Sequence, residues 1–177
     1  MQAARSSLSR TALFALAACS CVQMPAHAQV DLYSLEAAYI YNFTEFTEWP
    51  AAQTGGALTV CVEPHTELGV ALGKLSGRAV AGKTWSVKPI PEGGAVGACN
   101  VLIVDSAASS AAAKSASALD APTLIVRAVD ADASDTPYIV MLTRDGDRLR
   151  FDIDNKEAAR RHLGISSKLL RLARNVI

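Results

Sequence analysis

The chain has 177 residues, of which 50% are hydrophobic and 19% are charged. This length accommodates one domain with a substantial core but not two, and the apolar content excludes an intrinsically disordered chain. The 17 Lys and Arg are balanced by 17 Asp and Glu, so the sequence lacks the basic excess of a nucleic-acid-binding domain.

Residues 1–28 have the pattern of a secretory signal peptide. Arg5 and Arg10 supply positive charge, residues 11–22 (TALFALAACSCV) are apolar, and residues 26–28 (AHA) form a small-residue cleavage site. The apolar run is too short to span a membrane, and no later run approaches 18 apolar residues. We therefore expect an exported protein without a membrane span.

The expected mature domain is residues 29–177, with 15 Lys and Arg against 17 Asp and Glu. An alternative cleavage site precedes Cys19, because Leu-Ala-Ala-Cys at residues 16–19 fits a lipobox. Cleavage there would attach a lipid and tether the protein to a membrane surface.

The first part of the mature chain predicts two helices and two strands. Residues 31–49 carry apolar side chains at 32, 35, 39, 43, 46 and 49, which is the spacing of a helix with one apolar stripe, and Pro50 ends this helix. A short apolar run follows at 58–62, typical of a buried strand. Residues 66–75 predict a helix, and residues 83–90 predict a weaker strand.

The second part continues the alternation of strands and helices. Asp-Gly at 145–146 indicates a hairpin turn. In chain order the predicted elements are a strand at 99–104, a helix at 106–119, a strand at 123–129, hairpin strands at 138–143 and 148–153, a helix at 155–163 and a last helix at 166–176 capped by Ser166.

This order favours an α/β fold. Apolar strands that alternate with helices predict a single three-layer domain, with a mostly parallel central sheet flanked by helices and with a C-terminal hairpin and helices.

Cys61 and Cys99 are the two cysteines that remain after cleavage of the signal peptide. An even pair in an oxidising compartment predicts one disulfide. Both cysteines lie on predicted strands, and neighbouring strands would give a suitable Cα spacing. Two buried free thiols are the alternative, and the sequence leaves open whether a bridge is structural or a redox switch.

Catalytic and cofactor-binding patterns are absent from the mature sequence. His65 and His162 have no partner at metal-ligand spacing, and there is no G-x-S-x-G, P-loop or G-x-G-x-x-G motif. We expect no enzymatic activity, no metal and no cofactor. A deep cleft holding His162, or the pair Asp152 and Asp154 on one strand face, would favour an enzyme instead.

Basic residues gather near the C-terminus, where residues 144–177 contain nine Lys and Arg and five Asp and Glu. Lys168, Arg171 and Arg174 recur every three residues of the predicted last helix, which would place them on a basic ridge. Such a ridge can bind an acidic partner or anionic lipid, and a solvated helix face is the alternative.

Asn42 is a polar residue between Tyr41 and Phe43, beside the apolar stripe of the first predicted helix. A buried amide must find hydrogen-bond partners, so we expect a structural role in bonding neighbouring backbone. A role in ligand binding is the alternative.

Three segments together resemble the YfiR family of periplasmic regulators. YNFTEFTEWP, which holds Asn42, Phe43, Phe46, Trp49 and Pro50, resembles the family's opening motif. The cysteines in LTVCV and CNVLIV match cysteines in its strands. The ending FDIDNKEAARRHLGISSKLLRLA, which holds Ser166 and Ser167, resembles its closing segment.

The resemblance implies a non-enzymatic periplasmic repressor of an inner-membrane diguanylate cyclase. Such a protein would bind the periplasmic sensor domain of the cyclase, lower cyclic di-GMP and reduce biofilm. It would form a homodimer, and an outer-membrane-associated lipoprotein would sequester it. Phe43, Phe46 and Trp49 would anchor the first helix to the sheet, and redox tuning would rest on Cys61 and Cys99. A small-ligand-binding module that serves a sensor kinase or transporter is the alternative.

Overall fold

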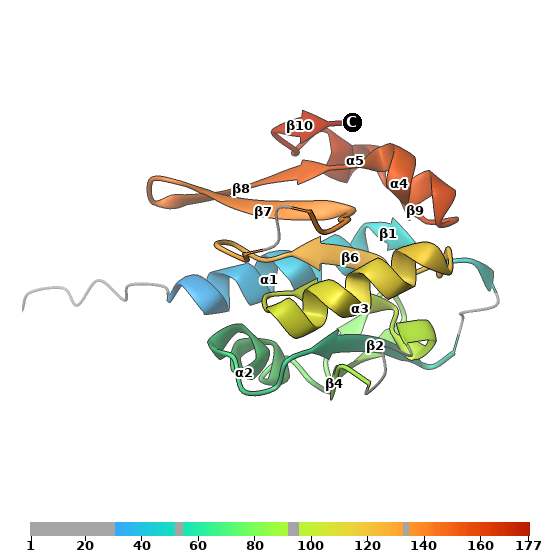
Figure 1. Ribbon diagram of the computed structural model, residues 1–177, viewed down its shortest axis with the longest axis horizontal. Coiled ribbons are helices and arrows are strands. Elements are labelled where there is room, and N and C mark those ends of the chain that lie inside the picture. The colour runs from blue at the N-terminus through green and yellow to red at the C-terminus, as the bar shows by residue number, and fades with distance from the viewer. Residues whose placement is uncertain (1–30, 52–54, 92–95, 133–134) are drawn as a thin grey trace, which may run out of the picture.

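An eight-stranded sheet separates two helical layers (Figure 1). The structure is a computed structural model that describes residues 31–51, 55–91, 96–132 and 135–177. Helices α1 (Leu32–Glu45) and α2 (Glu67–Gly73) cover one face of the sheet, and α3 (Ala107–Ala118) covers the other. This arrangement confirms the predicted three-layer α/β domain.

The sheet is mostly parallel, with antiparallel pairs near its edges. Its strand order is β10-β8-β7-β6-β5-β2-β4-β3. The parallel centre and the antiparallel hairpin β7–β8 were both predicted. The strands are β2 (Ala57–Val62), β3 (Ala79–Val80), β4 (Lys83–Pro89), β5 (Val101–Val104), β6 (Leu124–Arg127), β7 (Val140–Asp145), β8 (Arg148–Ile153) and β10 (Asn175–Val176).

Alternate residues of each central strand enter two different cores, because successive side chains of a strand point to opposite faces. On β5, Val101 and Ile103 pack under α1 and α2, whereas Leu102 and Val104 pack against α3. This explains why the central strands are apolar throughout rather than alternating with polar residues.

Helix α1 ends at Glu45, four residues before the predicted end at Trp49. Phe46 leaves the helical conformation, and Thr47 Oγ1 donates to the Phe43 carbonyl at 2.9 Å. Strand β1 (Thr47–Glu48) then pairs antiparallel with β9 (Gly164–Ile165). The predicted helix was therefore too long, because pairing with a distant strand replaces its last turn.

The predicted last helix at 166–176 is wrong. Ser166 does cap a helix, but α5 spans only Ser167–Leu170. The chain then returns to the sheet, where β10 pairs parallel with β8. Arg174 holds this return, because its Nε donates to Asp152 Oδ1 at 2.9 Å and its Nη2 donates to Asp152 Oδ2 at 2.5 Å.

Helix α4 (Asn155–Arg160) is also shorter than predicted. It begins after its N-cap Asp154 and ends at Arg160, and His162 has a positive φ of 57°. Gly164, which directly follows the predicted helix, lies in β9.

A disulfide joins Cys61 to Cys99, with a Cα–Cα distance of 5.8 Å. Cys61 lies on β2, while Cys99 lies two residues before β5 rather than on a strand as expected. Both cysteines are buried in the core beneath α3. The bridge therefore ties β2 to the segment that leads into the neighbouring parallel strand β5, on the sheet face opposite α1.

Arg161 is fully buried, which the sequence did not predict. Its Nε donates to Glu157 Oε1 at 2.7 Å, and its Nη1 donates to the Ala121 carbonyl at 3.1 Å. Its Nη2 donates to the Ser117 hydroxyl. This guanidinium therefore links α4 to the end of α3, and every one of these bonds removes part of the cost of burying its charge.

We predict that Cys99→Ser lowers the melting temperature by several degrees or more. The bridge closes a sequence separation of 38 residues, and the chain-entropy model assigns about 3.5–4 kcal/mol to a loop of this length. Scanning calorimetry of the variant and of the reduced wild-type protein should give similar shifts. An unchanged melting curve in both would contradict a stabilising bridge.

We predict that Arg161→Ala lowers the free energy of unfolding by about 3–5 kcal/mol, because it leaves Glu157 and two carbonyl groups without their buried partner. The matched control is Arg160→Ala, whose exposed side chain pairs with the same Glu157 and should cost about 1 kcal/mol or less. Urea denaturation measures both, and equal losses would refute the proposed role of the buried cation.

Candidate partner-binding groove

One flank of α1 lines an open groove instead of packing into the core. The helix contacts the sheet through Ala37, Ile40 and Phe43, which are at most 2% exposed. Of the residues in the predicted apolar stripe, only Phe43 is buried in the core. Four of its members are half-buried and lie along the groove or its end: Leu32, Leu35, Tyr39 and Phe46.

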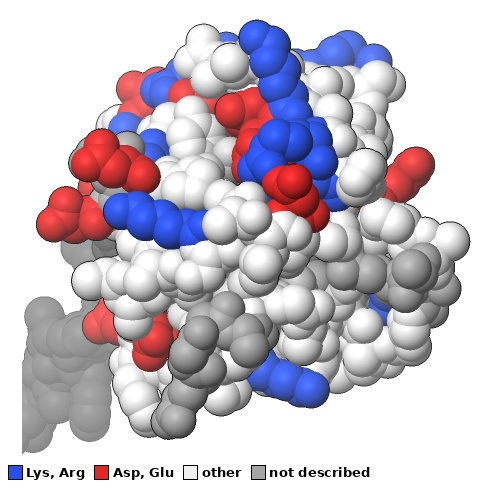
Figure 2. Space-filling view, turned by 45° about the vertical axis from the view of Figure 1, so that its right-hand side comes forward, with Lys and Arg blue, Asp and Glu red and all other residues white. Residues whose placement is uncertain are grey.

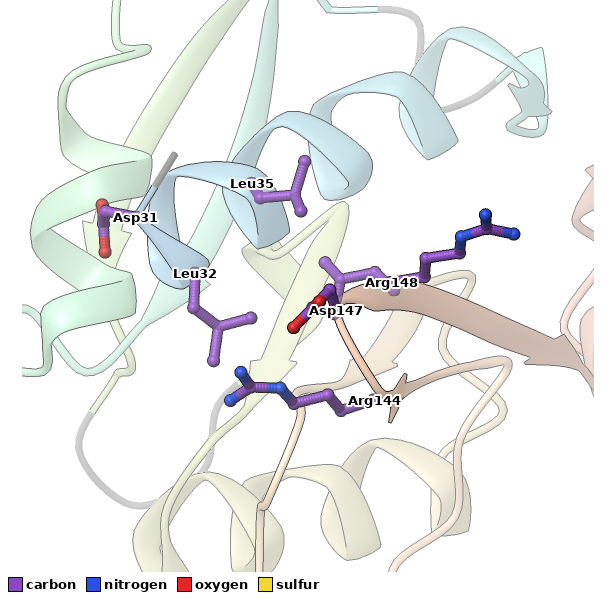
Figure 3. A pocket seen from close by; sticks show the side chains of 7 residues that line it. Asp31, Leu32, Leu35, Arg144, Asp147 and Arg148 are labelled. Carbon is purple, nitrogen blue, oxygen red and sulfur yellow. The ribbon is translucent and has the colours of Figure 1, made fainter. Parts of the chain in front are cut away.

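The groove consists of two adjoining cavities that share Leu149. The first cavity, of about 460 Å³, lies between the start of α1 and the β7–β8 hairpin. In Figure 3, Arg144 and Asp147 turn their charged ends toward Leu32, while Arg148 points away from Arg144. This end of the groove therefore combines leucine side chains with charges of both signs.

The second cavity, of about 570 Å³, lies between α1, β8 and α5. Its wall is aromatic, because Tyr39 and Phe43 meet edge to face at 6.1 Å and Phe43 packs on Phe151 at 4.9 Å between ring centroids. Lys168 places its Nζ 5.0 Å from the centre of the Phe46 ring. Leu172 also lines this cavity and is 65% exposed.

Asn42 is exposed and lines the second cavity. Its side chain makes no hydrogen bond with the residues that the structure describes, so the expected structural role in bonding neighbouring backbone is wrong. An amide that stands free beside an aromatic wall can donate to and accept from a bound group. This position favours the alternative role in binding.

The segment at the end of α1 meets the C-terminal segment of the chain at this groove. The backbone N–H of Ser166 donates to the Phe46 carbonyl at 3.0 Å, beside the β1–β9 pair. The Ser166 hydroxyl accepts the Leu169 N–H at 3.3 Å and so starts α5, with Ser167 as its first residue. The opening and closing segments singled out in the sequence thus build one surface.

Trp49 and Pro50 lie beyond the groove and are half-buried. Trp49 donates its indole N–H to the Asn100 carbonyl at 3.3 Å, and Lys83 lies over its ring at 5.7 Å. Phe43 alone of the three expected aromatic anchors is buried between α1 and the sheet. Phe46 and Trp49 instead fix the segment that follows α1.

The predicted basic ridge does not form, because α5 ends at Leu170 and Arg171 and Arg174 lie after the helix. Hydrogen bonds and charge from Arg174 hold the pKa of Asp152 below its usual value, so Arg174 is engaged in a structural ion pair. Arg171 lies beside the Ser167 hydroxyl, and Lys168 lines the groove. Figure 2 shows Asp and Glu side chains directly beside Lys and Arg side chains on the face in view.

The groove offers binding rather than bond-breaking chemistry. Its second cavity has apolar and aromatic walls, one free amide and two cations, Arg150 and Lys168. The residues weighed for catalysis lie elsewhere: His162 is exposed, Asp152 pairs with Arg174, and Asp154 caps α4. Within the described ranges, no group of three His, Cys, Asp or Glu side chains could hold a metal ion.

Three residues of the groove were not identified from the sequence: Leu149, Arg150 and Leu172. Leu172 lies within the predicted last helix, which does not form as predicted, so its exposure was not expected. Arg150 and Leu149 sit on the predicted hairpin strand, but only the packing of α1 and α5 around β8 reveals that they face a cavity.

The chain matches the sequence model of a protein family, and it is similar to a solved structure. Residues 33–174 match the sequence model of a protein family described as YfiR/HmsC-like. The chain is similar to the crystal structure of a conserved domain protein from Vibrio cholerae O1 biovar El Tor strain N16961, with 11% identity and a TM-score of 0.47. The similarity covers 82% of this chain and 60% of the other, so this chain spans less than two thirds of that protein. No curated protein matches the sequence.

Proposed function

The chain belongs to the YfiR/HmsC-like family, and we propose from this membership that it is a non-enzymatic signalling regulator of the periplasm. It binds the periplasmic sensor part of an inner-membrane diguanylate cyclase and represses the enzyme. Repression lowers cyclic di-GMP and with it biofilm output. Family membership supports the periplasmic regulatory role, and no helix in the described residues is long and apolar enough to cross a membrane.

The groove along α1 carries this proposal, because it is built from both segments that resemble the family. Regulators act through partner binding, and a binding surface needs a buried apolar centre with polar groups at its rim. Phe46 and Leu172 provide exposed apolar surface, and Asn42 provides an amide beside it. A partner side chain inserted between them would remove this apolar surface from water.

The charges around the second cavity indicate what the partner presents. Arg150 and Lys168 line it without a carboxylate in its wall, although Arg150 lies 3.7 Å from Asp145 outside it. A partner segment with an apolar or aromatic residue beside an acidic one would match this surface. If Lys168 and Arg171 only face solvent, as in the alternative interpretation, replacing either residue should leave partner binding unchanged.

A small-ligand-binding module that serves a sensor kinase or transporter is the second candidate. The observation that favours it is the volume of the second cavity, about 570 Å³, which lies in the range of small-molecule pockets.

We further infer how the protein is exported and how it assembles. Residues 1–28 act as the signal peptide and residues 29–177 as the working domain, and both Cys19 and the cleavage site lie outside the described residues. The domain acts as a homodimer that an outer-membrane-associated lipoprotein sequesters. The Cys61–Cys99 bridge tunes repression through its redox state.

We predict that the tagged protein captures a membrane protein with a cytoplasmic diguanylate cyclase domain from solubilised cell envelope. Mass spectrometry identifies the captured protein under oxidising and reducing conditions. Loss of capture on reduction would make the cysteine pair a switch. Capture of a sensor kinase or transporter instead would contradict the cyclase assignment and favour the ligand-binding module.

We predict that Leu172→Ser abolishes most of this capture without changing the melting temperature, because Leu172 is exposed in the groove. The matched control is Leu119→Ser, at the end of α3, where Leu119 is 70% exposed. Loss of an exposed leucine there should leave capture unchanged. If both variants capture the cyclase as the wild type does, the groove is not the docking surface.

A further inference from the structure

A third cavity, which shares no lining residue with the groove, lies at the carboxyl ends of the parallel strands. The order β4-β2-β5-β6 reverses direction between β2 and β5, because β2 connects to β4 on one side and the chain later returns to β5 on the other. In open parallel sheets, ligands bind in the crevice at such a reversal. A cavity of about 220 Å³ lies there, between α1, the start of α2 and the segments that follow β5 and β6.

Four carboxylates line this cavity, and no Lys, Arg or His does: Glu36, Glu67, Asp105 and Asp130. None of the four has an ion-pair partner among the described residues. The other wall is apolar and includes the Tyr33 ring, Leu68 and Ala131. The cavity thus combines concentrated negative charge with a surface that accepts methylene groups.

Glu36 is the buried member of this set, with 1% of its surface exposed. Its Oε1 accepts the backbone N–H of Val129 at 2.7 Å, whereas its Oε2 has no hydrogen-bond partner among the described residues. Burying an ionised carboxylate without a cation is costly, and the unbonded Oε2 of Glu36, which lines the cavity, can accept a hydrogen bond from a cationic group.

Neighbouring groups act on Glu36 from every side of the cavity. Burial is the largest cause that raises the pKa of Glu36 to about 7, the Val129 N–H opposes it, and the charges of Asp130 and Asp105 add to the rise. Burial likewise raises the pKa of Asp105, against hydrogen bonds from Thr66 and Ser109. The other titratable groups that line the cavity are Tyr33, on the same helix as Glu36, and Glu67 of α2.

We propose that this cavity binds a small aliphatic amine, whose ammonium group pairs with Glu36 and Asp105. A metal ion is disfavoured, because no three carboxylates of the described part converge as its ligands would. The volume of about 220 Å³ corresponds to roughly seven water molecules. That volume suits an alkyl chain of a few carbons with one or two ammonium groups, and the Tyr33 face can accept a cation.

The inference does not depend on the proposed regulatory function, because the cavity and the groove share no lining residue. Putrescine, a six-heavy-atom diamine, is the probe. Calorimetric titration and thermal shift at pH 8 should show binding to the wild-type protein. Binding should weaken as the pH falls from 8 to 5, because a protonated Glu36 no longer attracts an ammonium ion.

Without amine, the melting temperature should fall as the pH rises from 5 to 8. The pKa of Glu36 is higher in the folded than in the unfolded state, so this group favours folding while it is protonated and no longer does so once it ionises.

Glu36→Gln keeps an acceptor for the Val129 N–H but removes the charge. It should weaken putrescine binding at least about tenfold, as expected for loss of a charge-assisted hydrogen bond, and remove most of the pH dependence. Asp105→Asn is the second variant and should also weaken binding. The matched control is Glu45→Gln, at the exposed end of the same helix, which should bind as the wild type does.

Three results would overturn the proposal. The wild-type protein would show no binding at millimolar putrescine, or Glu36→Gln would bind equally well. Alternatively, 1,4-butanediol would reproduce the effect of the amine, which would show that the ammonium groups are not recognised, or Ca²⁺ alone would reproduce it, which would show that the alkyl chain is not recognised.

Discussion

The packing of α1 against the sheet is the contact on which both candidate sites depend. Only a narrow side of the helix, centred on Ala37, Ile40 and Phe43, enters the core. Because that side is narrow, one flank of α1 remains free to offer the apolar residues of the groove. The buried side itself presents Glu36 to the crevice at the strand ends. A single helix thus forms a wall of two cavities with opposite chemistry.

The C-terminal segment completes the groove because it does not continue as a helix. Arg174 binds Asp152 with two hydrogen bonds and draws the chain into the sheet edge as β10. The short α5 is thereby held across α1, with Lys168 and Leu172 over the aromatic wall. Had the last helix extended to Val176, Arg174 would have faced solvent, and the groove would have had a different wall.

Most of the fold was predictable because local pattern determines it. The runs LTVCV and CNVLIV are apolar except for Thr59 and Asn100, as is typical of strands covered on both faces, and Asp-Gly locates the hairpin. The errors occur where long-range pairing overrides local propensity, namely the β1–β9 pair and the β8–β10 pair. The site was harder to predict for the same reason. Helical spacing identified the stripe on α1, but only the tertiary structure shows which of its residues are covered. Arg161 and Glu36 look like ordinary surface charges in the sequence and are buried by elements far along the chain.

The position of the disulfide limits how a redox signal could reach the groove. Cys61 and Cys99 lie beneath α3, on the sheet face opposite α1, so the bridge touches no groove residue directly. The route that the structure offers runs through Asn100, the residue after Cys99, whose carbonyl accepts the indole N–H of Trp49. Trp49 follows β1, which in turn pairs with β9 just before α5. Reduction would therefore act on the groove by loosening the Cys99–Asn100 segment and the residues after α1. Glu36 lies in the N-terminal half of α1 and accepts the N–H of Val129, which follows β6. Changes at the disulfide and at Glu36 would therefore reach α1 at different points along its length.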